Sequence, residues 1–385
     1  MKIGIDCRLW NETGVGRYIR NLIKQLQIID NKNEYILFVL SKDYGSLKSQ
    51  ISNQKWTIIE ADIRWHSIAE QLEFPRILNR ENLDLMHFPY FSVPIFYKRP
   101  FVVTIHDLIQ NHYASGKAST LPSFFYYIKR IGYKRVLGNA VKKAKKIIVP
   151  LLCVKDDLIK TLKVQDGKII VTPEGFDPNI KKGKVSEKVL AATKDPYFLY
   201  VGNAYPHKNL GMLIEGFSTL CHPERSEGSR DSSALPQNDI RLLLVGREDF
   251  FYKRLEKKDN RNVIFLHGVT DSDLFYLYEH SIAAVSASLM EGFGLFPLEA
   301  LGAGTIPIVS NISSFHEVCG DLAIYFNPKD PNDIAEKLTK VLKLKDSERK
   351  EIKEKEKVWL ENFSWEKMAK ETLKVYESSS SASSE

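Results

Sequence analysis

The chain has 385 residues, of which 43% are hydrophobic and 27% charged, and this composition fits a globular protein long enough for two domains. No apolar run is long enough to span a membrane, so no transmembrane helix is expected. The four cysteines lack the spacing of zinc ligands, so no zinc site is expected. The net charge of +7 is uneven: residues 1–180 hold 27 Lys and Arg against 17 Asp and Glu, and residues 181–385 hold 28 against 31. Because the first residues form a strand-like run instead of a signal peptide, we expect a cytoplasmic protein.

Strand and helix signals alternate through the first half of the chain. Buried-type runs predict strands at residues 3–7, 34–41, 56–61, 83–88, 101–107 and 147–150. An apolar stripe at Ile19, Leu22, Ile23 and Leu26 predicts a helix over residues 17–27. Because the strands are continuous apolar runs separated by helices, we expect a parallel α/β sheet covered on both faces.

The pattern restarts in the second half. Strands are predicted at residues 197–202, 240–246, 262–268, 281–288 and 305–310. We therefore expect two α/β domains, an N-terminal one over residues 1–177 and a C-terminal one over residues 195–360, joined by a polar hinge. A helix at about 363–377, anchored by Phe363, Trp365 and Met368, is expected to cross back to the first domain.

Two segments fall outside this pattern. Residues 221–239 are rich in serine, proline and charge, and they lie between a predicted helix and a predicted strand. Because such connections are usually about 2–6 residues long, we interpret this segment as an inserted mobile loop. The serine-rich residues 378–385 are expected to form a disordered tail.

The first strand-to-helix junction, TGVGRY, carries Gly14 and Gly16. Glycines let backbone N–H groups approach a ligand, and the N-terminus of a helix favours an anion. The spacing is not the GxGxxG of dinucleotide-binding proteins, and a tight turn that needs glycine explains the residues almost as well. Both interpretations remain open from these residues alone.

A second junction, MEGFGLFPLE, places Glu291 and Glu299 eight positions apart around two glycines. Glu291 falls on the loop that follows a predicted strand, and Glu299 falls in the first turns of the next helix. Ligands of open α/β sheets bind at this end of the strands. Carboxylates accept hydrogen bonds from sugar hydroxyls, and the amides between them suit a phosphate, so the stretch is typical of a nucleotide-sugar site.

The stretch DSD at residues 271–273 could be a metal-binding DxD or the start of a helix. It precedes the apolar pattern LFYLY, which favours helix capping and a first-turn acid over a metal site. No metal is expected, since a lysine and helix-terminus amides can neutralise a diphosphate.

The stretch EGFGLFPLE has the E-x7-E form of the family-four retaining glycosyltransferases, which have the GT-B fold. Further stretches resemble this family in the same order, from residue 3 to about 374: IGIDCRLWNETGVGRYIRNL, DLMHFPYFSVP, VVTIHDL, VTPEGFD, YVGNAYPHKNL and FSWEKMAKETL. Within the family, the chain resembles bacterial mannosyl- or related hexosyltransferases of polysaccharide assembly. The resemblance implies two Rossmann-like, doubly wound parallel-sheet domains that face each other across a cleft. The N-terminal domain would be the acceptor side, and the C-terminal domain would bind the nucleotide-sugar.

The resemblance also implies a role for individual residues. Glu291 would hold hydroxyls of the donor sugar, Glu299 would bind the ribose, and Lys208 would neutralise the leaving diphosphate. His106 would lie beside the transferred sugar, as a catalytic residue with Glu291 and Lys208. The resemblance further implies that the backbone contacts the donor at two places. N–H groups of Phe293, Gly294, Leu295 and Phe296 would meet the sugar and diphosphate, and the backbone at Gly14 and Gly16 would come close to the diphosphate.

One departure from the family concerns a phosphate-binding cation. Many members have an arginine after the strand glycine or directly before the lysine, whereas this chain has Asn203 and His207 at these positions. The identity of the second phosphate-binding cation therefore stays open. It could be Arg247, which follows a later strand, or a protonated His207. Asn203 itself is kept among the donor-binding residues.

The resemblance implies a hexosyltransferase that needs no cofactor or metal beyond its nucleotide-sugar donor. We expect mannose from GDP-mannose as the donor and a hydroxyl of a glycan or polyprenyl-linked glycan as the acceptor. Two alternatives remain, a nucleotide-sugar epimerase or hydrolase and a catalytically silent nucleotide-sugar-binding protein. No nucleic-acid partner is expected, since no RNA- or DNA-binding module accompanies the basic residues.

A window without acidic residues runs from Leu108 to Lys155. Within it, residues 121–146 place Phe124, Phe125, Tyr126 and Tyr127 before eight cations. The aromatic end could pack in the first domain while the lysines stay in water. Alternatively, the segment could lie on an anionic membrane, peripherally on the inner face of the plasma membrane, and this second interpretation is favoured.

Overall fold

The computed structural model describes residues 1–53, 55–113, 123–176, 183–221, 239–257 and 262–380. Two compact units divide the chain. The first comprises Met1–His112, Ser119–Gly175 and Phe363–Glu385, and the second comprises Tyr113–Ala118 and Phe176–Asn362. The inserted loop expected at 221–239 lies outside the described residues except at its two ends.

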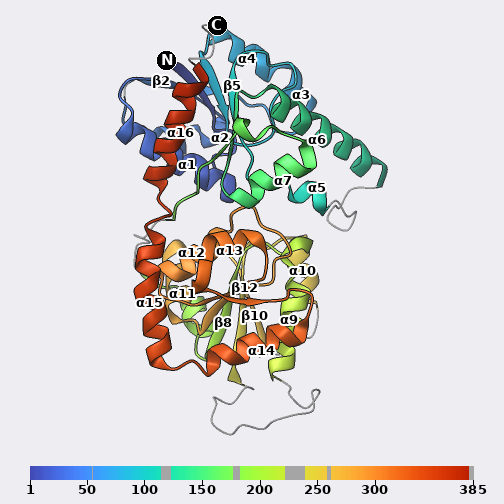
Figure 1. The fold of residues 1–385 in the computed structure, drawn as a ribbon, viewed down its shortest axis with the longest axis vertical. Coiled ribbons are helices and arrows are strands. Elements are labelled where there is room, and N and C mark those ends of the chain that lie inside the picture. The colour runs from blue at the N-terminus through green and yellow to red at the C-terminus, as the bar shows by residue number, and fades with distance from the viewer. Residues whose placement is uncertain (54, 114–122, 177–182, 222–238, 258–261, 381–385) are drawn as a thin grey trace. The chain divides into compact units, whose positions relative to one another are not determined.

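The first unit contains a seven-stranded sheet in the order β3-β2-β1-β4-β5-β6-β7, and every pairing is parallel (Figure 1). Its strands are β1 (Lys2–Asp6), β2 (Glu34–Val39), β3 (Trp56–Glu60), β4 (Leu85–Phe88), β5 (Phe101–Thr104), β6 (Lys146–Val149) and β7 (Ile169–Val171). The chain reverses its direction across the sheet between β1 and β4, which are neighbours. In open parallel sheets such a reversal marks the usual place for a ligand.

Helices lie in the connections between these strands, except between β4 and β5, which a loop joins. They are α1 (Gly14–Ile29), α2 (Ser41–Lys48), α3 (Ile68–Leu72), α4 (Phe74–Arg80), α5 (Ile109–His112), α6 (Ser123–Lys143) and α7 (Leu152–Leu162). The C-terminal helix α16 (Trp365–Ser380) also belongs to this unit, where it packs against α1, β4, β5 and β6. The buried face of α1 carries the stripe Tyr18, Ile19, Leu22, Ile23 and Leu26.

The second unit contains a six-stranded parallel sheet in the order β10-β9-β8-β11-β12-β13. Its strands are β8 (Tyr197–Val201), β9 (Arg241–Val245), β10 (Val263–Leu266), β11 (Ala283–Ser286), β12 (Pro307–Ser310) and β13 (Ile324–Phe326). Alternate residues of β8 enter two different cores: Phe198 and Tyr200 one, Tyr197 and Leu199 the other. Both faces of this sheet are therefore covered, as its continuous apolar strands predict.

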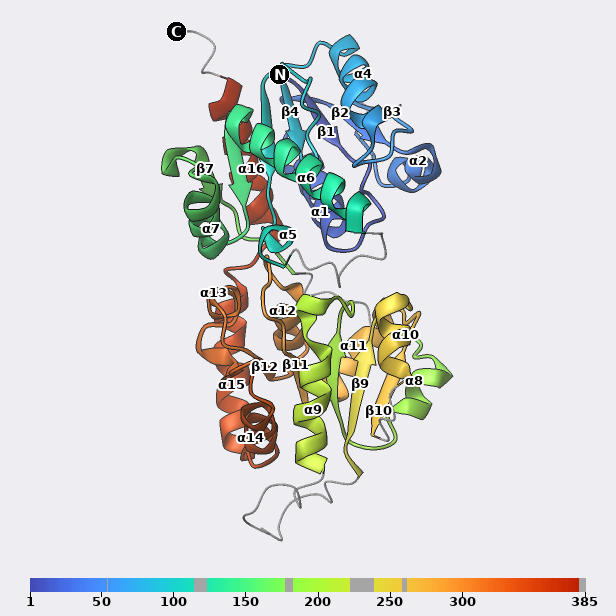
Figure 2. The same ribbon diagram turned by 90° about the vertical axis from the view of Figure 1, so that its right-hand side faces the viewer.

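The helices of the second unit are α8 (Glu187–Ala192), α9 (Leu210–Cys221), α10 (Phe250–Glu256), α11 (Asp271–His280), α12 (Leu295–Gly302), α13 (Ser313–Cys319), α14 (Pro331–Leu342) and α15 (Asp346–Leu360). Helices α9 and α14 lie side by side on one face of the sheet (Figure 2). The prediction of two Rossmann-like, doubly wound parallel sheets is confirmed.

The structure differs from the sequence-based expectations at several element ends. Strands β7 and β13 were not predicted, because three residues are too short to show a periodicity. Helix α1 begins at Gly14 instead of residue 17. The tail was predicted to be disordered from residue 378, but α16 continues to Ser380, and residues 381–385 lie outside the described part. Serine hydroxyls of this last turn donate to carbonyls of the preceding turn, and Ser379 is buried.

Candidate active site

The predicted site residues of the second unit follow two neighbouring strands. Strand β8 leads into a short 3-10 helix, Pro206–Lys208, and β11 leads into the loop that carries Glu291. Strands β8 and β11 pair with each other at the point where the strand order reverses. The fold therefore brings together two residues that are far apart in the sequence.

Lys208 and Glu291 form an ion pair that is mostly shielded from solvent. The Lys208 Nζ lies 2.6 Å from Oε1 and 2.8 Å from Oε2 of Glu291, and the Ser288 hydroxyl donates to Oε1 at 2.6 Å. Burial opposes ionisation of Glu291, but the charge and hydrogen bonds of Lys208 and the bond from Ser288 outweigh it and lower the pKa of Glu291. Glu291 is thus a carboxylate at neutral pH.

Tyrosines beneath the Lys208 loop hold its backbone. The Tyr200 hydroxyl donates to the carbonyl oxygen of Asn203 at 2.6 Å, and the Tyr252 hydroxyl donates to that of Gly202 at 2.8 Å. The side-chain oxygen of Asn203 accepts from the N–H of Tyr205 at 3.2 Å. Asn203 therefore shapes this turn, and any contact with a donor has to be made in addition to that bond.

Glu299 lies in α12, the helix that directly follows the Glu291 loop. Its side chain is 5% exposed and accepts a hydrogen bond from the Tyr278 hydroxyl at 3.0 Å.

Gly294 precedes α12 with φ of 79°, a conformation that favours glycine, and it provides no side-chain cap. The first-turn N–H groups of α12, at Leu295 and Phe296, therefore have no side-chain acceptor at the N-cap and can face an anion. Phe293 is buried.

The structure separates the candidates for a second phosphate-binding cation. Burial and the charge of Lys208 lower the pKa of His207 to about 4, although Glu291 acts in the opposite direction. His207 is therefore neutral at physiological pH, and the expectation that it could serve as a cation is not supported. Arg247 follows β9, is exposed, and pairs with no acid among the described residues. Of the two, only Arg247 can supply a positive charge.

In the first unit, His106 follows β5 and is held at both ring nitrogens. Nδ1 lies 2.9 Å from Oε1 of Glu174, and Nε2 lies 2.9 Å from the carbonyl oxygen of Pro89. The Tyr18 ring packs against the imidazole at 5.0 Å and 81°. Burial opposes protonation, but the bond and charge of Glu174 and the Pro89 carbonyl outweigh it and raise the pKa of His106. Two acceptors facing two nitrogens favour the imidazolium form.

Gly14 and Gly16 have different surroundings. A Cβ at Gly16 would lie 2.6 Å from the carbonyl oxygen of Trp10, so glycine is required for packing there. A Cβ at Gly14 would meet nothing within 4 Å. Thr13 makes no side-chain cap for α1, which leaves the first N–H groups of this 16-residue helix without a side-chain acceptor at the N-cap. Gly14 thus lies at an uncapped helix terminus, and Gly16 is explained by packing.

The stretch DSD begins α11 and caps it. Thr270 accepts from the N–H of Asp273 at 3.1 Å, and Asp273 accepts from the N–H of Thr270 at 3.0 Å, which is a capping box. The capping interpretation is therefore confirmed. Within the described ranges, no three His, Cys, Asp or Glu residues gather as metal ligands, and no helix there is long and apolar enough to cross a membrane.

Comparison with known proteins assigns residues 13–359 to protein families. A family model described as Glycosyltransferase Family 4 matches residues 13–180, and one described as Glycosyl transferases group 1 matches residues 181–359. The chain is a group 1, family 4 glycosyltransferase. The resemblance read from the motifs is thereby confirmed.

Individual relatives of this glycosyltransferase agree with the family models. It is 27% identical to the O-antigen chain mannosyltransferase RfbU of Salmonella typhimurium, over 83% of this chain and 84% of the relative. It is 25% identical to O-antigen chain mannosyltransferase B of Escherichia coli, over 94% and 96%. The crystal structure of a glycosyltransferase from Rickettsia africae has the same fold, with a TM-score of 0.70, 19% identity, and coverage of 98% of both chains.

Sequence reasoning missed two residues that hold candidate site residues, one in each unit. Glu174 lies in the stretch VTPEGFD, which was recognised without a role for its acid, and it holds His106. Ser288 lies three residues before Glu291 and hydrogen-bonds it. Glu174 lies between a proline and a glycine at the end of a strand, and this position could have indicated a role for it. The backbone of such a loop fixes where the carboxylate lies. Nothing in the sequence distinguished Ser288.

Replacing Glu174 with glutamine should lower the pKa of His106, because the charge that favours the imidazolium is lost while an acceptor remains. A group whose pKa is raised on folding stabilises the fold below its unfolded pKa and loses that effect as pH rises through its folded pKa. E174Q should therefore lose about 1–3 kcal/mol of unfolding free energy at pH 5.5, and the deficit should shrink at pH 8. Urea denaturation at both pH values, with NMR titration of the imidazole, measures this. A deficit that grows with pH would contradict the assignment.

Proposed function

We propose that the enzyme transfers a hexose from a nucleoside-diphosphate sugar to a hydroxyl of a glycan or lipid-linked glycan, with retention of the anomeric configuration. One observation carries the proposal: a lysine and an ionised glutamate pair at the strand-order reversal of the second unit, in the loops that precede α9 and α12. The lysine suits a diphosphate, and the carboxylate suits sugar hydroxyls.

The chemistry follows from the charges. As the bond between the anomeric carbon and the phosphate oxygen breaks, negative charge grows on the diphosphate, which Lys208 and the first amides of α12 stabilise. The acceptor oxygen bonds to the anomeric carbon from the leaving-group side, and its proton passes to the departing phosphate. Glu291 keeps the sugar oriented through its hydroxyls, and Glu299 takes the ribose. Arg247 is the candidate for a second phosphate-binding cation.

Mannose from GDP-mannose is the donor that we propose first, because two relatives that align over most of this chain carry the name O-antigen chain mannosyltransferase. The test is incubation with GDP-mannose, UDP-glucose, UDP-galactose and UDP-N-acetylglucosamine, with and without mannosyl acceptors of defined anomeric form. Transfer from GDP-mannose that gives an α-linked product supports the proposal. A β-linked product would overturn retention, and conversion or hydrolysis that is equally fast without an acceptor would favour an epimerase or hydrolase.

We also propose that the protein works at the cytoplasmic face of an anionic membrane, attached through α6. One face of α6 exposes Tyr127, Ile128 and Ile131, with exposed fractions of 63%, 51% and 36%. Lys134 and Arg135 are exposed one turn further along. Exposed aliphatic and aromatic groups next to cations suit the interface of an anionic bilayer, where each cation contributes about 1 kcal/mol.

The membrane proposal predicts salt-sensitive binding to vesicles that contain 30% phosphatidylglycerol. K134Q/R135Q should weaken co-sedimentation about 10- to 30-fold, because two cations leave the surface. These two residues are a better choice than Lys143 and Lys146, whose amines donate to the carbonyls of Ile95 and Gly167. The control K350Q/K357Q removes equal charge from α15 and should bind as the wild type does. Binding that ignores lipid charge, or that falls equally in both variants, would refute the attachment.

A further inference from the structure

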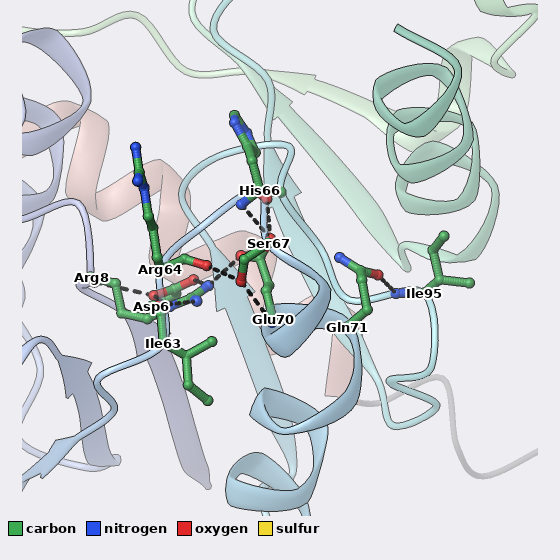
Figure 3. A network of polar contacts seen from close by, with 10 residues as sticks. Asp6, Arg8, Ile63, Arg64, His66, Ser67, Glu70, Gln71 and Ile95 are labelled. Atoms are coloured by element: carbon green, nitrogen blue, oxygen red, sulfur yellow. Dashed lines mark hydrogen bonds and ion pairs between the residues drawn. The ribbon is translucent and has the colours of Figure 1, made fainter. Parts of the chain in front are cut away.

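A buried ionic network lies at the carboxyl end of the first sheet, in loops that the proposed donor chemistry does not use (Figure 3). Arg8 follows β1 and is 1% exposed. Its guanidinium lies 2.7 Å from Asp6 and 2.8 Å from Glu70, and its Nη1 donates to the Ile63 carbonyl at 2.9 Å. Since a buried ion pair costs desolvation and contributes little net stability, such a network is better explained by the loop arrangement that it imposes.

Glu70 is the centre of this arrangement. The other carboxylate oxygen of Glu70 accepts from the Ser92 hydroxyl at 2.7 Å and from the backbone N–H of His66 at 2.8 Å. The segments that follow β1, β3 and β4 are thus tied to one fully buried carboxylate. Strands β1 and β4 are the neighbours at which the strand order reverses, so the tied loops occupy the usual ligand position of an open parallel sheet.

His66 is held in a conformation that histidine seldom adopts. Its φ is 59°, in the left-handed region, which costs of the order of 1 kcal/mol for a residue other than glycine. The hydrogen bond from its N–H to Glu70 fixes this conformation. As a result, the imidazole points away from the buried network, on the same side as the side chain of Arg64 (Figure 3).

The His66 ring completes a group of four aromatic rings that we call the aromatic shelf: His66, Tyr90, Phe91 and Tyr133. His66 stacks on Phe91 at 5.2 Å and 26° and lies 5.8 Å from Tyr90. Phe91 is buried and meets Tyr133 of α6 edge-on at 4.9 Å, whereas His66 is exposed. The shelf therefore holds the partly exposed His66 ring on an aromatic base.

Cations border the shelf. Partial burial of the ring, together with the charges of Lys129, Arg8 and Arg64, lowers the pKa of His66 to about 4. The ring is therefore neutral at physiological pH and can stack on an apolar surface. Lys129 lies one helical turn before Tyr133 on α6, and both Lys129 and Arg64 are exposed. An anion that binds beside the ring would find two charges available.

We propose that the aromatic shelf binds the sugar ring of the acceptor, with Lys129 and Arg64 beside it for a phosphate or diphosphate attached to that sugar. The assignment rests on the proposed function, which requires a second sugar in addition to the donor. The donor-binding acids and lysine lie in the second unit, and the shelf lies at the ligand-binding edge of the first sheet. The apolar C–H face of a pyranose packs on a flat neutral ring, and the buried network keeps that ring in place.

The test uses saturation-transfer NMR with GDP and UDP in excess, so that the donor site is filled. The probes are octyl glycosides and decyl diphosphates of mannose, glucose, galactose and N-acetylglucosamine. H66G removes the ring and relieves the left-handed strain, and it should weaken both kinds of probe about tenfold or more. H66F keeps a flat ring and should retain the neutral probes. K129Q should weaken only the diphosphates, and the matched control K350Q should weaken neither.

The outcomes separate the shelf from the proposed function. Urea denaturation and GDP affinity of each variant show whether it is folded. H66G is the variant least expected to misfold, because glycine adopts the left-handed conformation without strain. If wild-type protein transfers or hydrolyses a donor but binds no probe, or if H66G binds every probe as the wild type does, the shelf is overturned and the transferase function stands. If no donor is bound or turned over, the proposed function fails instead.

Discussion

Glu291→Gln should reduce hexose transfer by about 10²- to 10³-fold or more while leaving the fold intact, because a carboxylate that orients the sugar in the transition state is replaced by a neutral amide. The lowered pKa of Glu291 means that its charge is present throughout the neutral range. Gln is nearly isosteric and can keep the hydrogen bond from Ser288, so urea denaturation should change little.

The same substitution should leave affinity for the nucleoside diphosphate unchanged or raise it up to about tenfold, since Lys208 loses the partner that competes with a phosphate. Calorimetric titration with GDP and UDP measures this, next to the transfer rate. Wild-type turnover in E291Q would remove Glu291 from the site. Loss of turnover together with loss of diphosphate affinity would show that the pair acts only as a structural unit. The matched control is Glu279→Gln on α11, which should leave both quantities near their wild-type values.

Lys208→Ala should lower both donor affinity and the rate of transfer. One charge-assisted bond to the diphosphate is worth about 1.5–3 kcal/mol, which corresponds to about 10- to 100-fold in affinity. A further loss of about 10²-fold in rate is expected, since negative charge on the diphosphate grows in the transition state. Lys208→Met is the better-matched variant because it keeps most of the side-chain length, and it should behave similarly.

Removal of Lys208 also takes away the main influence that lowers the pKa of Glu291, and burial then raises that pKa. The residual activity of K208M should therefore rise with pH as Glu291 ionises, whereas the wild type should not show this step. A pH–rate profile for both proteins checks the expectation. In the double variant K208M/E291Q the two losses should not add, because the residues are in direct contact. Strict additivity would contradict the coupling.

The sequence by itself determined the architecture of this protein. Continuous runs such as residues 34–41 and 240–246 are typical of buried strands of parallel sheets, because such strands are apolar on both faces. The order of short stretches from residue 3 to 374 indicated the glycosyltransferase family, and the position of Glu291 after a strand predicted that it lies at the ligand-binding end of a sheet. DSD was recognised as a capping sequence, because capping depends only on local chemistry.

Tertiary structure decided what depends on residues far apart in the chain. That Lys208 and Glu291 touch follows from the pairing of β8 with β11, which no local pattern contains. The neutral state of His207 arises from burial and from Lys208, and the raised pKa of His106 arises from Glu174, 68 positions away. The left-handed conformation of His66 likewise depends on a carboxylate held by Arg8. A pKa or a strained backbone angle reflects the summed surroundings of a group, and only the folded chain assembles those surroundings.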